Sequence, residues 1–89
     1  MGRDQAPPDA LQSARALLAA ALELAPEELP EDAAIGGVGS WDSLAHMRLI
    51  MALEEHLGRS LPPDTMVAIG SLADVVAVLE GKTLGHAGY

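Results

Sequence analysis

Apolar residues recur at helical spacing in three stretches of the chain, separated by segments rich in proline and glycine. The first stretch runs from about residue 9 to 24 and is rich in alanine and leucine, which are strong helix formers. The second runs from 43 to 57 and stops at Gly58, a residue type that favours helix C-termini. The third starts at Ser71, and Asp74 follows three residues later, as in a capping box. This pattern predicts three main helices.

The same spacing assigns the faces that these helices bury. In the first helix, which Asp9 can cap, the stripe consists of Leu11, Ala14, Leu18, Ala21 and Leu22, widened by Leu17 and Leu24. In the last helix it consists of Leu72, Val75, Val76 and Leu79. Between the second and last helices, residues 65–69 follow a proline turn and a possible cap at Asp64, so we expect one short helix there.

Residues 25–42 form an unusually long connection for a compact domain. Its apolar residues can pin it to the core, and they are Leu29, Ile35, Val38 and Trp41. No segment has the alternation of a strand. We therefore predict an all-α fold, a small antiparallel bundle of three main helices plus one short helix, with a long loop between helices 1 and 2. The predicted domain spans 9–81, with a flexible N-terminus at 1–8 and a flexible tail at 82–89.

The second helix carries two apolar stripes rather than one. Leu49, Ile50, Leu53 and Leu57 fall within about 100° of one another and form the expected core face. Leu44, Met47 and Met51 form a second cluster within about 60°, far from the first. Either the long loop buries this second stripe, or the stripe is an exposed patch for docking.

Composition excludes several classes of function. The net charge is -8, from 13 acidic and 5 basic residues, which argues against nucleic-acid binding. There is no cysteine, so disulfides and thiolate metal sites are excluded. No run is long enough for a membrane span, and the first residues match neither a signal peptide nor a myristoylation motif. We expect a cytoplasmic protein and a monomer.

Ser43 lies where the long loop becomes a helix. Helix N-termini favour phosphate, so the hydroxyl is well placed to carry a phosphodiester, although serine there often only caps the helix. A serine hydrolase is a distant alternative. His46 lies three residues on, but the G-x-S-x-G elbow is absent, and we interpret His46 as a partly buried structural residue. His46 and His56 lie on different helix faces, so no metal site is predicted.

The motif Asp42-Ser43-Leu44 at this junction, followed by the run Leu53 to Gly58, resembles the acyl carrier proteins. The resemblance covers about residues 9–81. It implies that Ser43 receives a 4′-phosphopantetheine arm from coenzyme A, added by a phosphopantetheinyl transferase. The thiol of the arm then carries acyl, polyketide or aminoacyl groups as thioesters. The protein itself is then no enzyme.

The resemblance also implies roles for the neighbouring residues. Asp42 helps the transferase to recognise the site, and the apolar contact positions beside the arm are Leu44, Met47 and Met51. Glu54 and Glu55 meet basic docking patches on acyl-loading and synthase enzymes, and charge reversal at both is expected to leave the fold intact.

Three positions depart from the carriers of primary fatty-acid synthesis. Arg48 stands where those carriers usually have an acid, His46 replaces a small polar residue, and Trp41 precedes the motif. These departures favour a dedicated pathway, such as a polyketide, nonribosomal peptide or specialised lipid route. The alternative from another class is a non-catalytic helical adaptor, which binds a partner without the arm.

Overall fold

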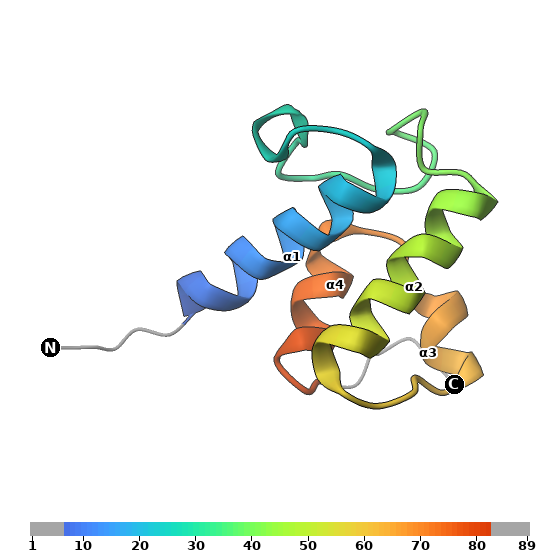
Figure 1. Cartoon of the computed structure of the whole chain (residues 1–89). Helices are drawn as coiled ribbons and strands as arrows, with labels where there is room; N and C mark the ends of the chain where they lie inside the picture. The colour runs from blue at the N-terminus through green and yellow to red at the C-terminus, as the bar shows by residue number, and fades with distance from the viewer. Residues whose placement is uncertain (1–6, 83–89) are drawn as a thin grey trace, which may run out of the picture.

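The computed structural model describes residues 7–82, and in this part of the chain the regular secondary structure is helical (Figure 1). The elements are α1 (Pro7–Leu22), the 3-10 turn η1 (Pro26–Glu28), α2 (Ser43–Leu57), α3 (Pro63–Ala68) and α4 (Leu72–Leu79). Within this part of the chain there are only isolated β-bridges, and no strand. The prediction of an all-α bundle with a long first loop is confirmed. Of the predicted flexible ends, residues 1–6 and 83–89 lie outside the described residues.

The bounds of α1 differ from the prediction at both ends. The helix begins at Pro7 rather than at a cap on Asp9, because proline is tolerated in a first helical turn, where its missing N–H costs nothing. It ends at Leu22 because Glu23 takes a left-handed conformation, with φ of 62°. The Leu24 N–H then bonds to the Ala19 carbonyl at 2.8 Å, which closes the helix end.

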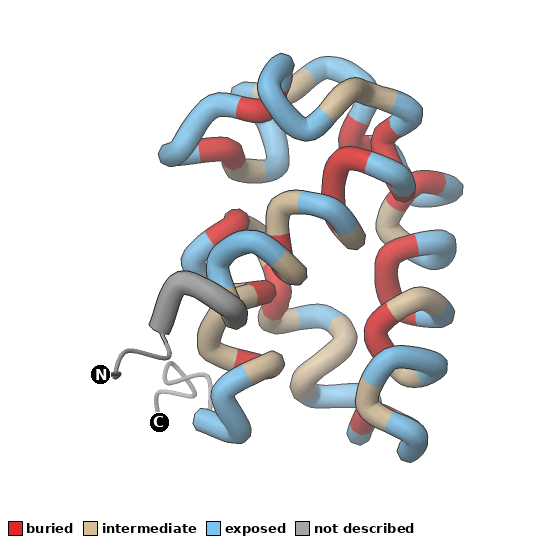
Figure 2. The backbone as a smooth tube through the Cα atoms, turned by 60° about the vertical axis from the view of Figure 1, so that its left-hand side comes forward, coloured by how far each residue is buried: buried red, intermediate tan, exposed pale blue. Residues whose placement is uncertain are grey.

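α1 packs against both α2 and α4, and their apolar faces form one core. Figure 2 shows the buried parts of the helices turned toward the interior. The predicted core face of α2 is confirmed, since Leu49, Ile50 and Leu53 are buried and Leu57 packs against them. Leu11 is the exception in α1. It is 44% exposed, since it lies toward the N-terminal end of the helix, which projects from the bundle (Figure 1).

The long loop is held to the core by side chains and by hydrogen bonds. Leu29 and Trp41 are buried and Val38 packs against the core, as predicted. The Arg15 guanidinium on α1 donates to the carbonyls of Pro26 and Leu29, at 3.2 and 2.7 Å. A charged donor satisfies loop carbonyls well, so this contact fixes the start of the loop.

The middle of the loop pairs with the segment before α4. The Ile35 N–H bonds to the Gly70 carbonyl at 3.0 Å, and the Leu72 N–H bonds to the Ala33 carbonyl at 2.9 Å. Ala33 is buried at this crossing, which the sequence did not indicate. Ile35 was predicted to be buried and is instead 52% exposed, because the backbone pairing holds this segment and leaves the side chain outside.

The termini of the last two helices follow local side-chain chemistry. The Ser71 hydroxyl accepts from the Asp74 N–H at 3.1 Å and caps α4, as predicted. Asp64, in contrast, is not a cap. The N-cap of α3 is Pro62, and Asp64 lies inside the first turn, because the two prolines already fix the helical entry. Among residues 7–82, no helix combines the length and apolar character that a membrane crossing requires.

Candidate functional site

Ser43 is the first residue of α2, and its side chain is exposed. The cap of this helix is the preceding residue, because Asp42 Oδ1 accepts from the Ala45 N–H at 2.9 Å. The Asp42 carbonyl accepts the His46 N–H at 2.9 Å. The capping role that we considered for Ser43 therefore belongs to Asp42, and the Ser43 hydroxyl points outward for other chemistry.

The geometry around Ser43 suits a phosphate ester. The first N–H groups of a helix point out of its end, and α2 contributes a partial positive charge there. An open hollow of about 430 Å³ lies beside the hydroxyl. Its lining is largely apolar or aromatic and consists of Ile35, Trp41, Asp42, Ser43, His46 and Met47.

The second apolar stripe of α2 is exposed. Leu44, Met47 and Met51 are 61%, 57% and 64% exposed, and the long loop does not cover them. The alternative that the loop buries this stripe is therefore wrong, and its use for docking stays a prediction. We call these three residues the α2 stripe. A row of large apolar side chains in water is unfavourable unless a partner covers it, so the α2 stripe is a candidate docking surface.

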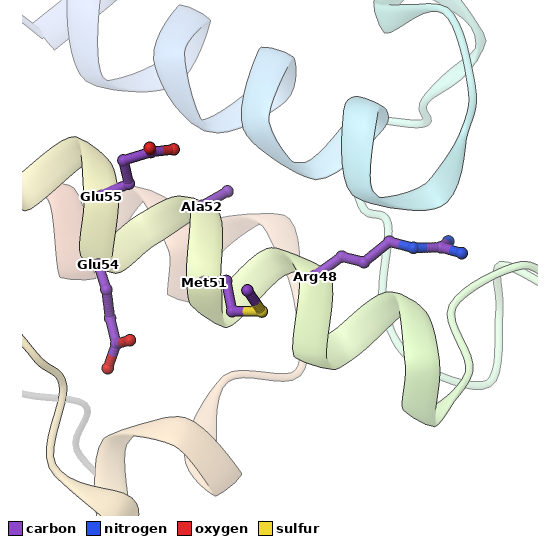
Figure 3. Close-up of a pocket in the computed structure, with 5 residues that line it drawn as sticks. All are labelled: Arg48, Met51, Ala52, Glu54 and Glu55. Atoms are coloured by element: carbon purple, nitrogen blue, oxygen red, sulfur yellow. The ribbon is translucent and has the colours of Figure 1, made fainter.

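The two acids at the end of α2 differ in their surroundings. Figure 3 shows that Glu54 and Glu55 point to opposite sides of the helix. Glu54 is half-buried, and its Oε2 accepts the Leu61 N–H at 2.9 Å. Glu55 is exposed. Glu54 therefore closes the turn between α2 and α3, a structural role that its helical position alone did not indicate.

Arg48 extends from α2 toward the end of α1 (Figure 3). Its Nη1 lies 3.5 Å from the Ala21 carbonyl and 3.6 Å from Glu23 Oε2. The arginine side chain is nonetheless 45% exposed, so it also contributes positive charge to the surface of α2. Arg48 also lines a second open hollow. The other residues of its lining are Met51, Ala52, Glu54 and Glu55.

His46 is half-buried, as predicted, and both of its ring nitrogens are engaged. Its Nδ1 accepts the Trp41 indole N–H at 3.1 Å, and its Nε2 lies 2.8 Å from the Met66 carbonyl. No ring nitrogen is left to take a proton from Ser43. A Ser43–His46 hydrolase is therefore not supported. The contact between Trp41 and His46 was not predicted from the sequence.

Among residues 7–82, no group of three or more His, Asp or Glu side chains is placed to hold a metal ion. The site consists instead of an exposed hydroxyl at a helix N-terminus, a hollow beside it and an exposed apolar stripe.

Comparison with known proteins shows the family. A family model described as "Phosphopantetheine attachment site" matches residues 12–79, which is most of the chain and includes all four α-helices in whole or in large part. No curated protein matches.

Proposed function

The chain belongs to the phosphopantetheine attachment site family, and on this premise we propose that it carries biosynthetic intermediates on an arm attached to Ser43. Domains of this family bear 4′-phosphopantetheine covalently and act as carriers rather than as catalysts. Ser43 is proposed as the attachment residue because it is exposed at the start of α2, beside the open hollow. We also propose that the whole chain acts only as a carrier and has no catalytic residue.

The residues around Ser43 fit the group. Ser43 is exposed, and Asp42 rather than Ser43 caps the helix. The N-terminus of α2 stabilises the negative charge of a phosphodiester, and Leu44 and Met47 offer apolar contacts next to it. When bound, the group supplies a thiol on which cargo is held as a thioester.

The attachment step is a phosphoryl transfer at Ser43. The serine Oγ forms a bond to the phosphorus that bears the pantetheine portion of coenzyme A. The pyrophosphate bond of coenzyme A breaks, and adenosine bisphosphate leaves. The transferase supplies the base that takes the serine proton, because His46 has both ring nitrogens engaged. Asp42 is proposed as a recognition residue for that enzyme.

The partners are proposed to be the transferase and the acyl-loading and synthase enzymes of one pathway. These enzymes dock on the α2 stripe, and their basic side chains face Glu55 and, to a smaller extent, Glu54. Glu54 is the weaker candidate because its carboxylate already accepts the Leu61 N–H. Such docking has to be brief, since a carrier leaves each enzyme before it reaches the next.

We propose that the pathway is a dedicated one, such as a polyketide, nonribosomal peptide or specialised lipid route. The support is the exposed positive charge of Arg48 on α2, which would repel the basic patch that a carrier of primary fatty-acid synthesis meets. A cytoplasmic location and a monomeric state belong to the same proposal.

Intact mass decides the main point. The protein is incubated with coenzyme A, magnesium and a broad-specificity phosphopantetheinyl transferase, alongside Ser43→Ala and the matched control Ser40→Ala, since Ser40 is also exposed. We expect one phosphopantetheine on the wild type and on Ser40→Ala, and none on Ser43→Ala. Modification of Ser43→Ala would place the arm elsewhere. No modification of any variant by several transferases would favour the adaptor that the sequence left as an alternative.

A further inference from the structure

The imidazole of His46 links the end of the long loop, α2 and α3. The Trp41 indole N–H, at the end of the long loop, donates to His46 Nδ1 on α2 at 3.1 Å. His46 Nε2 in turn lies 2.8 Å from the Met66 carbonyl on α3. The two rings are also stacked, with centroids 6.2 Å apart and planes inclined by 24°.

The donors and acceptors fix the protonation state of this histidine. An indole nitrogen can only donate, so His46 Nδ1 has to be the acceptor and carries no proton. The proton then lies on Nε2, which donates to the Met66 carbonyl. Only the neutral Nε2–H tautomer satisfies both bonds. A second proton on Nδ1 would face the indole N–H, and the bond to Trp41 would be lost.

This linkage borders the proposed attachment site. Trp41 and His46 both line the hollow beside Ser43. Trp41 is buried and directly precedes Asp42, the cap of α2, so a fixed indole also fixes the backbone that leads into Ser43. No side chain caps the N-terminus of α3. The hydrogen bond from His46 to the Met66 carbonyl instead joins this helix to α2.

We propose that His46 is a positioning residue of the attachment site, which in its neutral form holds the Trp41 indole and α3 against α2 and keeps the Asp42–Ser43 junction ready for the transferase. The effect on modification rests on the proposed function, whereas the hold on Trp41 does not. The test therefore has two readouts, one on the unmodified protein alone and one with the transferase.

Two substitutions separate the two bonds. His46→Asn keeps an acceptor near the position of Nδ1 and loses the donor to Met66. His46→Gln keeps a donor near the position of Nε2 and loses the acceptor for Trp41. His56→Gln is the matched control, because His56 is an exposed histidine on the same helix. All comparisons are made at a temperature at which circular dichroism shows each variant to be folded.

The first readout is the indole N–H resonance of the chain's single tryptophan in 15N-labelled protein. We expect His46→Gln to move this resonance toward that of free indole in water and to speed its exchange with water. His46→Asn should retain most of the wild-type shift, and His56→Gln all of it. An unchanged resonance in His46→Gln would overturn the proposal.

The second readout is kcat/KM for phosphopantetheine transfer to Ser43. We expect a loss of fivefold or more in His46→Gln, at most twofold in His46→Asn and none in His56→Gln. Equal rates in His46→Gln and the wild type would overturn the positioning role. If the wild type took up no group, the proposed function would fail, and the indole resonance would still decide whether His46 holds Trp41.

Discussion

At the scale of single residues, Asp42 has two separable roles. Its carboxylate caps α2 through the Ala45 N–H, and its charge lies next to the proposed attachment hydroxyl. Asparagine caps helices about as well as aspartate, whereas alanine does not. We therefore expect Asp42→Ala to lower the free energy of unfolding by about 1 kcal/mol and Asp42→Asn to leave it nearly unchanged. Urea denaturation measures both.

The same pair of variants isolates the charge in transferase recognition. Asp42→Asn should lower kcat/KM for modification although the fold is intact. Ser43→Ala retains the Asp42 cap, so its free energy of unfolding should lie within about 0.5 kcal/mol of the wild-type value. A large destabilisation by Ser43→Ala would instead mean that the serine has the capping role.

Glu54 and Glu55 are neighbours that we expect to respond differently to the same change. Glu54→Ala leaves the Leu61 N–H without its acceptor, which costs about 1–3 kcal/mol for a buried donor. Glu55→Ala removes an exposed side chain and should cost less than about 0.5 kcal/mol. Chemical denaturation of the two variants tests this difference. Similar values would show that the Leu61 N–H finds water in place of Glu54. This refines the expectation that charge reversal at both acids would leave the fold intact.

At the scale of elements, α2 presents one face to the core and, as we propose, another to partners. Leu53 is fully buried, and Leu53→Ala should cost about 2–5 kcal/mol. Met47→Ala and Met51→Ala remove exposed side chains and should each cost less than about 1 kcal/mol. We expect the two methionine variants to lower kcat/KM with partner enzymes much more than stability. Denaturation and transferase kinetics on the same samples distinguish the faces, and a large loss of stability in either methionine variant would contradict the docking role.

The sequence predicted the elements well where local chemistry dictates them. The bounds of α2 agree with the prediction, because the Asp42 cap and the left-handed Gly58 are both local signals. The predicted end of α1 was wrong because Glu23, an ordinary helix former, adopts a left-handed conformation that ends the helix at Leu22. The Ile35 prediction failed because pairing of its backbone with Gly70 decided its position.

Ser43 and the α2 stripe could be proposed from the sequence, whereas the contacts of His46 and Glu54 could not. Ser43 and the α2 stripe follow from helical periodicity and from the junction at which they lie. The contact of His46 with Met66 joins residues 20 positions apart, and no periodicity reports a contact of that kind. The engagement of Glu54 with Leu61 depends on how the chain turns after Gly58, which is equally invisible in a helical projection.

At the scale of the whole molecule, the acidic net charge of -8 and the local charge on α2 act over different distances. Net charge steers basic partners from afar and is screened by salt, whose Debye length falls from about 30 Å at 0.01 M to about 10 Å at 0.1 M. A contact charge acts at the docking surface itself. The same Glu→Lys substitution, made at two different positions, can separate the two effects.

Glu55→Lys and Glu27→Lys change the net charge equally, but Glu55 flanks the α2 stripe and Glu27 lies in the 3-10 turn of the long loop. Both side chains are exposed. At low ionic strength we expect Glu55→Lys to lower transferase kcat/KM by fivefold or more and Glu27→Lys by less than twofold. The difference between the two losses of kcat/KM should become smaller as salt is raised to about 0.3 M, because partly exposed charge pairs are screened. Equal losses in both variants would mean that only the net charge matters and that α2 is not the docking helix.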